Sequence, residues 1–433
     1  MKYYSTNRQS PKADFRTAAL TGQPSDKGLY FPEEIPFLER KMIREIKNIS
    51  KEEIAWNLLT SYTVGSIPPD VLKNMIDAAF DFDFPLVRVN EDTFSLELFH
   101  GPTLAFKDVG ARFLSQCFSY FMQHENQKTV ILVATSGDTG GAVANAFSNI
   151  NGVEVVILYP AGKVSEVQEW QLISCGDNVK ALRISGNFDD CQRMVKEAFA
   201  DPLLDEKLSL TSANSINIAR WLPQQVYYLD ALRQWEFPEL PVVSVPCGNL
   251  GNIGAGLLAM RSARLDVPFI AACNANKAMY DYLTTGQYYP ASTVVTVSNA
   301  MDVGAPSNFS RIMEMFPGGS RELKETLSSY TITDAQTIKL IQEEVAGSGY
   351  HLDPHGAVAF AALQKHRKGA KQKGIFLETA HPVKFPEVTG GMRGSEEMLP
   401  DAIRILKDRK KNFTSLSGNY SDLRDFLLSM EKN

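Results

Sequence analysis

From residue 129 onward, the chain alternates between short runs of apolar residues and longer segments with helical spacing. The apolar runs predict strands at 129–137, 153–160, 179–186, 241–249, 268–273 and 373–380. Between them, residues 140–147 and 215–235 are patterned as helices. Apolar runs bounded by glycine, with helices between them, indicate parallel sheets that are covered on both faces. Ligands of such sheets bind beyond the carboxyl ends of the strands, so the loops there are the first place to look for chemistry.

The N-terminal part of the chain has a different pattern. Residues 1–95 are interrupted by proline and glycine. A charged stretch from Glu39 to Glu53 carries apolar residues at spacings that predict a surface helix.

Composition narrows the class of protein. The chain has 433 residues, with 44 Lys+Arg against 50 Asp+Glu and a formal net charge of −6. This mildly acidic balance argues against a general nucleic-acid binder, which needs a basic surface. It does not exclude a small anionic ligand, because such a site needs only a few local donors. No run approaches the ~18 apolar residues of a membrane span, and the N-terminus has no apolar core of a secretory signal.

The five cysteines form neither a disulfide framework nor a zinc pattern, since their number is odd and no C-x-x-C occurs. This favours, weakly, a reducing compartment such as the cytoplasm. His351 and His355 have the i,i+4 spacing of metal ligands, but Pro354 interrupts the helix that would align them. There is no HExxH motif and no Gly-x-Ser-x-Gly elbow. The sequence therefore predicts no metal site.

The first unusual loop is Thr135–Ala142, TSGDTGGA, directly after a predicted strand. It places hydroxyl residues and glycines at the start of a helix, where free backbone N–H groups and the helix dipole favour a carboxylate or phosphate. An ordinary tight turn with an Asp or Thr cap explains the same residues equally well.

The second loop is Pro246–Gly256, PCGNLGNIGAG. Its glycines allow the backbone to approach an anion closely and to form a phosphate cup. It is not a P-loop, because no Gly-Lys-Ser/Thr ends it, and its dinucleotide-like Gly254-x-Gly256-x-x-Ala259 lacks the acidic residue expected ~20 positions later. Cys247, at the end of a strand, is expected to be a buried structural thiol.

The third loop is His100–Asp108, HGPTLAFKD. Lys107 precedes an amphipathic helix, so it stands at a helix N-terminus, where the dipole disfavours a cation. The pKa of a lysine at such a position is expected to be lowered, and its neutral amine can then form an imine. Without further context, a solvated surface lysine is the ordinary interpretation.

Five motifs together resemble the threonine synthase family of pyridoxal-5′-phosphate (PLP) enzymes with fold type II. In the family's order they are HGPTLAFKDVGARF, TSGDTGGAV, NSINIARWLPQ, VPCGNLGN and TAHPVKF, and the opening YYSTNRQSPKADF also resembles the family's longer members. The resemblance implies an α/β fold with two parallel-sheet αβα domains, the active site between them and a mainly helical N-terminal segment. The domains implied are an N-terminal segment 1–95, a large PLP-binding domain 96–127 plus 236–433, and a small domain 128–235.

The resemblance also implies the cofactor contacts. Lys107 matches the lysine that forms the internal aldimine and moves protons, with Phe106 and Asp108 as its neighbours in the motif. Thr379 matches the hydroxyl that binds the pyridine nitrogen. The loop that holds the cofactor phosphate matches Gly248, Asn249, Leu250, Gly251 and Asn252.

The loop facing the substrate carboxylate and the cofactor ring hydroxyl matches Thr135, Ser136, Gly137, Asp138 and Thr139. Many fold-type-II enzymes carry Asn where Asp138 stands, so the aspartate changes the charge count at the ring oxygen. Lys384 either adds charge near the substrate or is exposed on the surface.

The group expected to face the substrate phosphate is Asn214, Ser215 and Arg220. An arginine fork beside amide and hydroxyl donors suits a dianionic phosphate. A capped helix with an exposed arginine explains the same residues as well.

The family reaction implied is the conversion of O-phospho-L-homoserine and water to L-threonine and phosphate, through PLP aldimine intermediates by γ-elimination and β-addition of water. This is the last step of threonine biosynthesis and a carbon–oxygen lyase activity. A serine/threonine dehydratase or β-replacement enzyme would share Lys107 and the glycine loop but need no substrate-phosphate donors. A non-catalytic protein that binds a phosphorylated ligand and, more distantly, a nicotinamide dehydrogenase also stay open. The expected partner is a small molecule, not nucleic acid or membrane, with a monomer and a homodimer both open.

Overall fold

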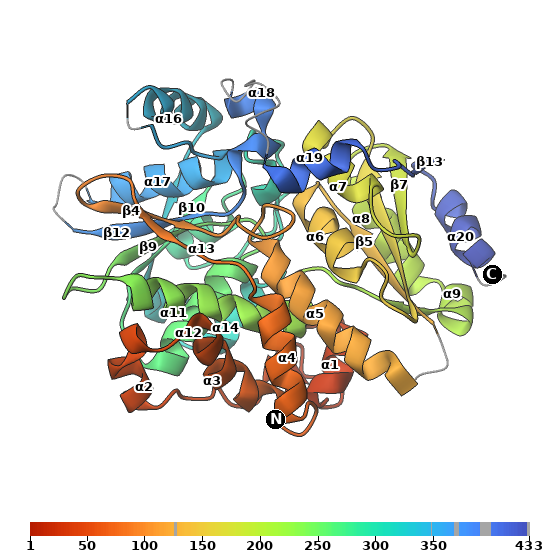
Figure 1. Ribbon diagram of the computed structural model, residues 1–433, viewed down its shortest axis with the longest axis horizontal. Helices are drawn as coiled ribbons and strands as arrows, with labels where there is room; N and C mark the ends of the chain where they lie inside the picture. The colour runs from red at the N-terminus through yellow and green to blue at the C-terminus, as the bar shows by residue number, and fades with distance from the viewer. Residues whose placement is uncertain (125–127, 348, 368–371, 390–399, 431–433) are drawn as a thin grey trace.

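The computed structural model describes residues 1–124, 128–347, 349–367, 372–389 and 400–430 (Figure 1). Within them, two parallel-stranded sheets are flanked by helices, as the sequence predicts, and a short antiparallel pair joins β1 (Tyr3–Ser5) to β2 (Tyr30–Pro32). No helix in this part of the chain is long and apolar enough to cross a membrane. The same residues contain no group of three or more His, Cys, Asp or Glu that could hold a metal ion.

The larger sheet has the order β11-β10-β9-β12-β4-β3, and all its pairings are parallel except that of β3 with β4. Its strands are β3 (Leu86–Arg88), β4 (Thr93–Glu97), β9 (Val242–Pro246), β10 (Phe269–Cys273), β11 (Leu327–Thr331) and β12 (Gly374–Glu378). The smaller sheet, with the order β13-β7-β6-β5-β8, is parallel throughout. Its strands are β5 (Thr129–Ala134), β6 (Val153–Pro160), β7 (Val179–Ser185), β8 (Ser209–Thr211) and β13 (Thr414–Ser417).

The six predicted strands are confirmed, with ends that differ by a few residues. Of the missed strands in these two sheets, β3, β8, β11 and β13 lie at sheet edges, where half-exposed residues weaken the apolar signal. Strand β4 is different, because it is almost fully buried beside β12. Its sequence TFSLE mixes polar and apolar residues, so the apolar run that marks a buried strand is absent.

The helices before the small sheet are α1 (Phe15–Thr21), α2 (Arg40–Arg44), η1 (Ile46–Asn48), α3 (Lys51–Thr63), α4 (Pro69–Ala79), α5 (Lys107–Phe121) and η2 (Met122–His124). Those of the middle part are α6 (Asp138–Phe147), α7 (Glu166–Ile173), α8 (Phe188–Ala200), α9 (Pro202–Lys207), α10 (Ile218–Trp221), η3 (Leu222–Gln224) and α11 (Gln225–Gln234). The remaining ones are α12 (Gly251–Ala263), α13 (Ala278–Thr285), η4 (Asn299–Met301), α14 (Phe309–Met315), α15 (Gly319–Leu323), α16 (Asp334–Gly347), α17 (Pro354–Arg367), η5 (Pro382–Lys384), α18 (Pro386–Thr389), α19 (Asp401–Lys407) and α20 (Tyr420–Ser429).

The single surface helix predicted from Glu39 to Glu53 is wrong. The chain instead forms α2, η1 and the start of α3, with Ile49 in extended conformation between the last two. Ser50 and Glu53 make a reciprocal capping box that begins α3. A strong N-cap inside a charged, periodic stretch therefore starts a new helix.

The helix predicted over 215–235 is present as three consecutive segments, α10, η3 and α11. Asn217 caps the first, with its side chain accepting from Ala219 N at 3.0 Å. Pro223 lies in the 3-10 helix η3. Its missing N–H changes the hydrogen-bonding pattern there, but α11 follows directly.

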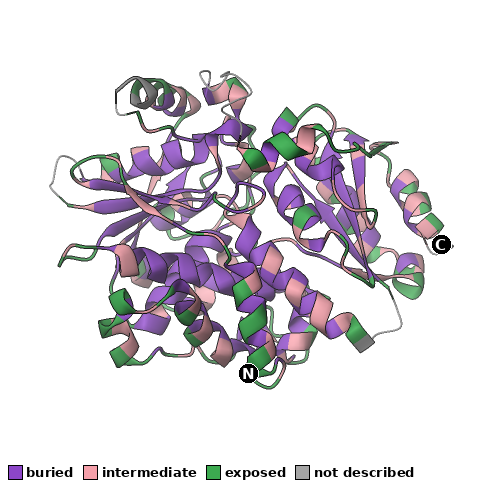
Figure 2. Cartoon of the chain, in the orientation of Figure 1, coloured by how far each residue is buried: buried purple, intermediate pink, exposed green. Residues whose placement is uncertain are grey.

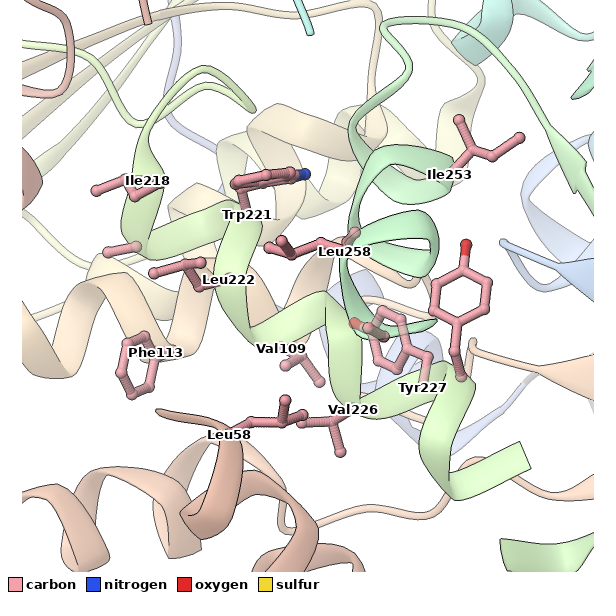
Figure 3. Close-up of a cluster of buried hydrophobic side chains, with 14 of the residues drawn as sticks. Leu58, Val109, Phe113, Ile218, Trp221, Leu222, Val226, Tyr227, Ile253 and Leu258 are labelled. Atoms are coloured by element: carbon pink, nitrogen blue, oxygen red, sulfur yellow. The ribbon is translucent and has the colours of Figure 1, made fainter. Parts of the chain in front are cut away.

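The core that positions α5 is formed by several helices (Figure 3). Side chains from α3, α5, α10, α11 and α12 interlock there, and all of them are at most 2% exposed. They include Leu58, Val109, Trp221, Tyr227 and Leu258. Figure 2 shows α5 buried along most of its length. This packing fixes the direction of α5 and therefore the position of its first residue, Lys107.

The division into 1–95, 96–127 plus 236–433, and 128–235 remains a prediction, but strand pairing differs from it in two places. Strands β3 and β4 belong to the larger sheet, so the boundary at residue 95 falls inside β4. Strand β13 pairs with β7, and Leu423 and Leu427 of α20 join the core of the smaller sheet. Residues 414–430 therefore pack with the smaller sheet.

Candidate active site

Lys107 is the first residue of α5, as its position before an amphipathic segment predicts. The loop leading to it is held against the residues that follow β12. Phe106 N donates to Thr379 O at 2.9 Å, and Ala105 bridges to Ala380. Lys107 and Thr379, far apart in sequence, are thus fixed on adjoining backbone segments.

The Lys107 amine lies in a mixed electrostatic environment. Its side chain is 16% exposed, and Nζ lies 3.8 Å from Asp138 Oδ2. Burial lowers the pKa of Lys107, and the charges of Lys384 and Arg220 act in the same direction, while Asp138 opposes them. The net direction is downward, so the neutral amine needed for imine formation is more accessible than in a surface lysine.

Asp138 begins α6 and is almost completely buried. Its Oδ1 accepts from Lys384 Nζ at 2.7 Å and from Gln168 Nε2 at 3.0 Å. Burial by itself would raise the pKa of this carboxyl, but the charges of Lys384 and Lys107 outweigh it and hold the pKa below its usual range. Asp138 is therefore an ionised group at neutral pH.

The interpretation of Lys384 as an exposed surface lysine is wrong. Its side chain is 0% exposed, and Nζ also donates to Thr103 O at 2.9 Å. Lys384 ends η5, a short 3-10 helix after β12 whose three residues are all buried. Asp108, also buried, accepts from Thr103 N at 2.9 Å and from Thr103 Oγ1 at 2.5 Å, and burial raises its pKa to about 6.

The loop 135–139 forms a tight turn into α6. Thr135 Oγ1 accepts from Gly137 N at 3.0 Å and from Gly140 N at 2.8 Å, so this hydroxyl already stabilises the turn. Gly137 has φ +135°, and a Cβ there would lie 2.4 Å from Gln168 Cδ, so the position requires glycine. Ser136 and Thr139 are partly exposed.

The loop after β9 turns into α12 through Leu250, whose φ of +58° lies in the left-handed region. The first hydrogen bond of α12 runs from Gly254 N to Leu250 O. The backbone N–H groups of Gly251, Asn252 and Ile253 therefore have no acceptor within the helix. A Cβ on Gly248 would lie 2.9 Å from Ala300 O. The glycine spacing predicts a phosphate cup, and the amides at the start of α12 are donors that such a cup would use.

Two asparagines of this loop have distinct surroundings. Asn252 Oδ1 accepts from Tyr228 Oη at 2.7 Å, whereas its buried Nδ2 has no partner among the described residues. Asn249 Nδ2 donates to Ser215 Oγ at 2.6 Å, and Asn249 Oδ1 accepts from Ser307 N at 2.6 Å. Asn249 therefore connects the glycine loop to the segment predicted to face the substrate phosphate.

The interpretation of Arg220 as an exposed arginine on a capped helix is also wrong. Arg220 is 3% exposed; it donates to Ala213 O at 2.5 Å and to Lys107 O at 3.5 Å. Burial lowers its pKa to about 10. Its Nε and the enclosed Oδ1 of Asn214 have no partner in the described part of the chain. A buried guanidinium with an unused donor is suited to an anionic ligand.

Cys247 is buried, with its pKa raised by burial, which confirms the expectation of a structural thiol. Thr379, 6% exposed, directly follows Glu378 at the end of β12.

Sequence reasoning missed Gln168, Asn308 and Arg311. All three are buried and contact predicted site residues, yet each belongs to a helix or helix cap without a glycine-rich turn. No local pattern marks them, because only the fold brings them to the site.

The arrangement fits PLP. The α12 amides and the unpartnered Asn252 Nδ2 are donors for a phosphate, Lys107 is an amine for the aldehyde, and Thr379 offers a hydroxyl for the ring nitrogen.

Family models match three consecutive parts of the chain. Residues 2–80 match the threonine synthase N terminus, residues 85–377 match the pyridoxal-phosphate dependent enzymes, and residues 356–427 match the threonine synthase C-terminal region. The matches span nearly the whole sequence.

Curated relatives and solved structures agree with this. The chain is 41% identical to threonine synthase of Serratia marcescens and 39% identical to that of Escherichia coli K12, in each case over 99% of this chain and 100% of the relative. The crystal structure of the Escherichia coli enzyme aligns with a TM-score of 0.90 at 38% identity, covering 99% of this chain and 100% of that one. PLP-bound threonine synthase from Brucella melitensis aligns with a TM-score of 0.91 at 35% identity, covering both chains completely. On this evidence, the chain belongs to the threonine synthase family of PLP-dependent enzymes.

Proposed function

We propose that the residues around Lys107 carry out the threonine synthase reaction, in which O-phospho-L-homoserine and water give L-threonine and phosphate. In this reaction the bond between Cγ and the phosphate oxygen breaks, and the hydroxyl of water finishes on Cβ. Full-length relatives at about 40% identity support this activity for the chain.

The observation that carries the assignment of roles is the convergence of three segments at Lys107. Asp138 from the start of α6 lies 3.8 Å from its amine, and Arg220 from α10 reaches its backbone carbonyl. Thr379, after β12, holds the preceding residue. An amine, a carboxylate and a guanidinium from separate elements thus lie at one position, and the backbone of Thr379 is fixed beside it.

PLP, when bound, withdraws electrons from the substrate carbons, so that protons can leave carbons that are otherwise too weakly acidic. Lys107 is proposed to hold the cofactor, to take one proton from Cα and one from Cβ, and to give protons to Cγ, which becomes the methyl group as phosphate leaves, and finally to Cα. Its lowered pKa suits both tasks, because the neutral amine accepts a proton and the ammonium gives it back near neutral pH.

Two separate groups of donors are proposed for the two phosphates. Gly248, Asn249, Leu250, Gly251 and Asn252 would hold the cofactor phosphate, chiefly through the amides at the start of α12. Asn214, Ser215 and Arg220 would hold the phosphate of the substrate. The bond from Asn249 to Ser215 fixes the spacing between the two groups.

The loop Thr135–Thr139 is proposed to face the substrate carboxylate through the backbone amides and the partly exposed hydroxyls of Ser136 and Thr139. Asp138 is proposed to lie beside the cofactor ring oxygen. Many fold-type-II enzymes have asparagine at the position of Asp138, so the aspartate adds a negative charge. The ammonium of Lys384 neutralises that charge.

The larger sheet, with β3 and β4, is proposed as the main PLP-binding domain, and the smaller sheet, with β13 and α20, as the second domain. A reducing compartment such as the cytoplasm is proposed as well. All five cysteines are free, which supports that placement.

The test is to supply the chain with PLP and O-phospho-L-homoserine and to measure threonine and phosphate together. We expect equal amounts of both products, and we expect Lys107→Ala to make neither while keeping the wild-type fold by circular dichroism. Phosphate without threonine, or a keto acid formed from threonine, would contradict the assignment.

A threonine deaminase from Solanum lycopersicum aligns with a TM-score of 0.56 at 17% identity, which shows a shared fold alone.

A further inference from the structure

Arg311 is a completely buried cation that the roles above do not use. It lies on α14, and its side chain is 0% exposed. All its hydrogen bonds in the described part of the chain go to neutral oxygens: Tyr30 O at 3.1 Å, Asn308 Oδ1 at 2.9 Å, Ile216 O at 2.6 Å and Ser215 O at 3.5 Å. No ion pair with a carboxylate is found for it among these residues. A buried guanidinium without a carboxylate partner is costly, and an anion held nearby would offset part of that cost.

The neighbours of Arg311 show where that anion would lie. Asn308, also 0% exposed, accepts from Arg311 and donates through Nδ2 to Asn249 O at 3.0 Å. The same Nδ2 lies 3.4 Å from the position of a Cβ added to Gly251. Arg311 therefore reaches the glycine loop through a single side chain.

On its other side, Arg311 supports the segment proposed for the substrate phosphate. Its guanidinium donates to the carbonyls of Ser215 and Ile216 and lies 4.6 Å from the ring centre of Trp221. Trp221 Nε1 in turn donates to Gly251 O at 3.1 Å. Arg311 is thus connected with one member of the proposed substrate-phosphate group, Ser215, and with Asn249 and Gly251 of the glycine loop.

We propose that Arg311 is a positioning residue that supplies buried positive charge to the anion-binding region formed by Ser215 and the glycine loop, acting through Asn308 without touching the phosphates. This rests on the proposed roles of those two segments. A neutral donor could satisfy the same carbonyl oxygens, but only a cation adds favourable long-range attraction for dianionic phosphate in a region shielded from water. The chain as a whole is acidic, with a net charge of −6, so this attraction has to be local.

The test separates the charge of Arg311 from its hydrogen bonds. Asn308→Asp keeps an oxygen acceptor for Arg311 and neutralises it, whereas Asn308→Ser removes the amide without adding charge. Both variants lose the bond to Asn249. We expect inorganic phosphate to bind Asn308→Asp about tenfold more weakly than Asn308→Ser, by calorimetry on the PLP-loaded protein, and the melting temperature of Asn308→Asp to be at least as high. A difference in phosphate affinity below threefold overturns the proposal.

A second pair of variants decides the matter where Asn308→Asp does not fold. Arg311→Lys keeps the charge with fewer donors, and Arg311→Gln keeps donors without the charge. Phosphate affinity at least threefold weaker in Arg311→Gln than in Arg311→Lys supports the proposal, and a smaller difference contradicts it. Wild-type protein assayed for threonine and phosphate in parallel distinguishes a failure of this inference from a failure of the proposed function.

Discussion

Lys384 Nζ lies 2.7 Å from Asp138 Oδ1, in an ion pair whose side chains are 0% and 3% exposed. Asp138 is also the carboxylate nearest to the Lys107 amine in the ion pairs of the described chain. An ionised aspartate in such a position needs a buried cation, since the carboxyl would otherwise be neutralised by protonation. The pair therefore contributes, together with burial and the charge of Arg220, to the electrostatic environment of Lys107.

Lys384→Met is expected to destabilise the protein by about 3–5 kcal/mol, because it removes the closer partner of a buried carboxylate. Asp138→Asn is expected to destabilise for the reciprocal reason. The double variant should recover most of the loss, since both charges are then absent. Urea unfolding of the four proteins without cofactor measures this coupling. Purely additive losses would show that the two residues do not act as a pair.

Glu378→Gln is expected to make stability less dependent on pH. Burial and the charge of Asp353 raise the pKa of Glu378 well above its usual value. Its contribution to stability is therefore complete below the unfolded-state pKa of about 4.3. That contribution is lost as pH rises toward the folded-state pKa. The variant should gain melting temperature relative to wild type at pH 8 and not at pH 4.

The matched control is Glu387→Gln, at an exposed position on α18. It should leave the pH profile of the melting temperature as in wild type. An identical profile for Glu378→Gln would mean that the Glu378 carboxyl titrates in the folded protein as it does in the unfolded chain.

Gly248→Ala is expected to weaken PLP binding by about tenfold or more. A Cβ there would meet Ala300 O and Met301 Cα, each at 2.9 Å, and these are backbone atoms that move only if the loop moves. Fluorescence titration of the cofactor-free protein with PLP measures the affinity. The control is Gly254→Ala, inside α12, where the nearest atom is Trp221 Nε1 at 3.4 Å. We expect the PLP affinity of this variant to stay within about twofold of wild type. Its free energy of unfolding should rise by about 0.5–1 kcal/mol, because alanine favours the helix over glycine.

Arg220→Lys is expected to raise the KM for O-phospho-L-homoserine by about tenfold to a hundredfold, since hydrogen bonds to charged groups contribute about 1.5–3 kcal/mol. Lysine keeps the charge but cannot present the planar fork. Inhibition by product phosphate should weaken in parallel. Arg233→Lys, at a partly exposed arginine that pairs with the buried Asp230, serves as the control and should leave KM unchanged. A fall in kcat with KM constant would place Arg220 outside the substrate-phosphate site.

Local sequence patterns predicted the central strands and the loops that carry the site. Continuous apolar runs predicted the central strands, and the position of Lys107 before an amphipathic segment predicted the head of α5. The glycines at 248 and 251 predicted a turn after the strand whose backbone can approach an anion closely, and the turn is present before α12. These features depend on residues that are close together in the chain, so the local sequence is enough to predict them. The capping box that divides residues 39–53 was equally local but was hidden by the stronger charge periodicity.

What the sequence by itself determined is the six central strands, the loops with donors and, through family motifs, the residues proposed for the site. Only the tertiary structure decided that Lys384 is buried against Asp138, that Asn249 joins Ser215, and that Arg311 lies behind both phosphate segments. Each of these contacts joins residues from separate elements. Their burial, and with it their pKa and charge balance, is set by packing between the elements, which no window of neighbouring residues contains.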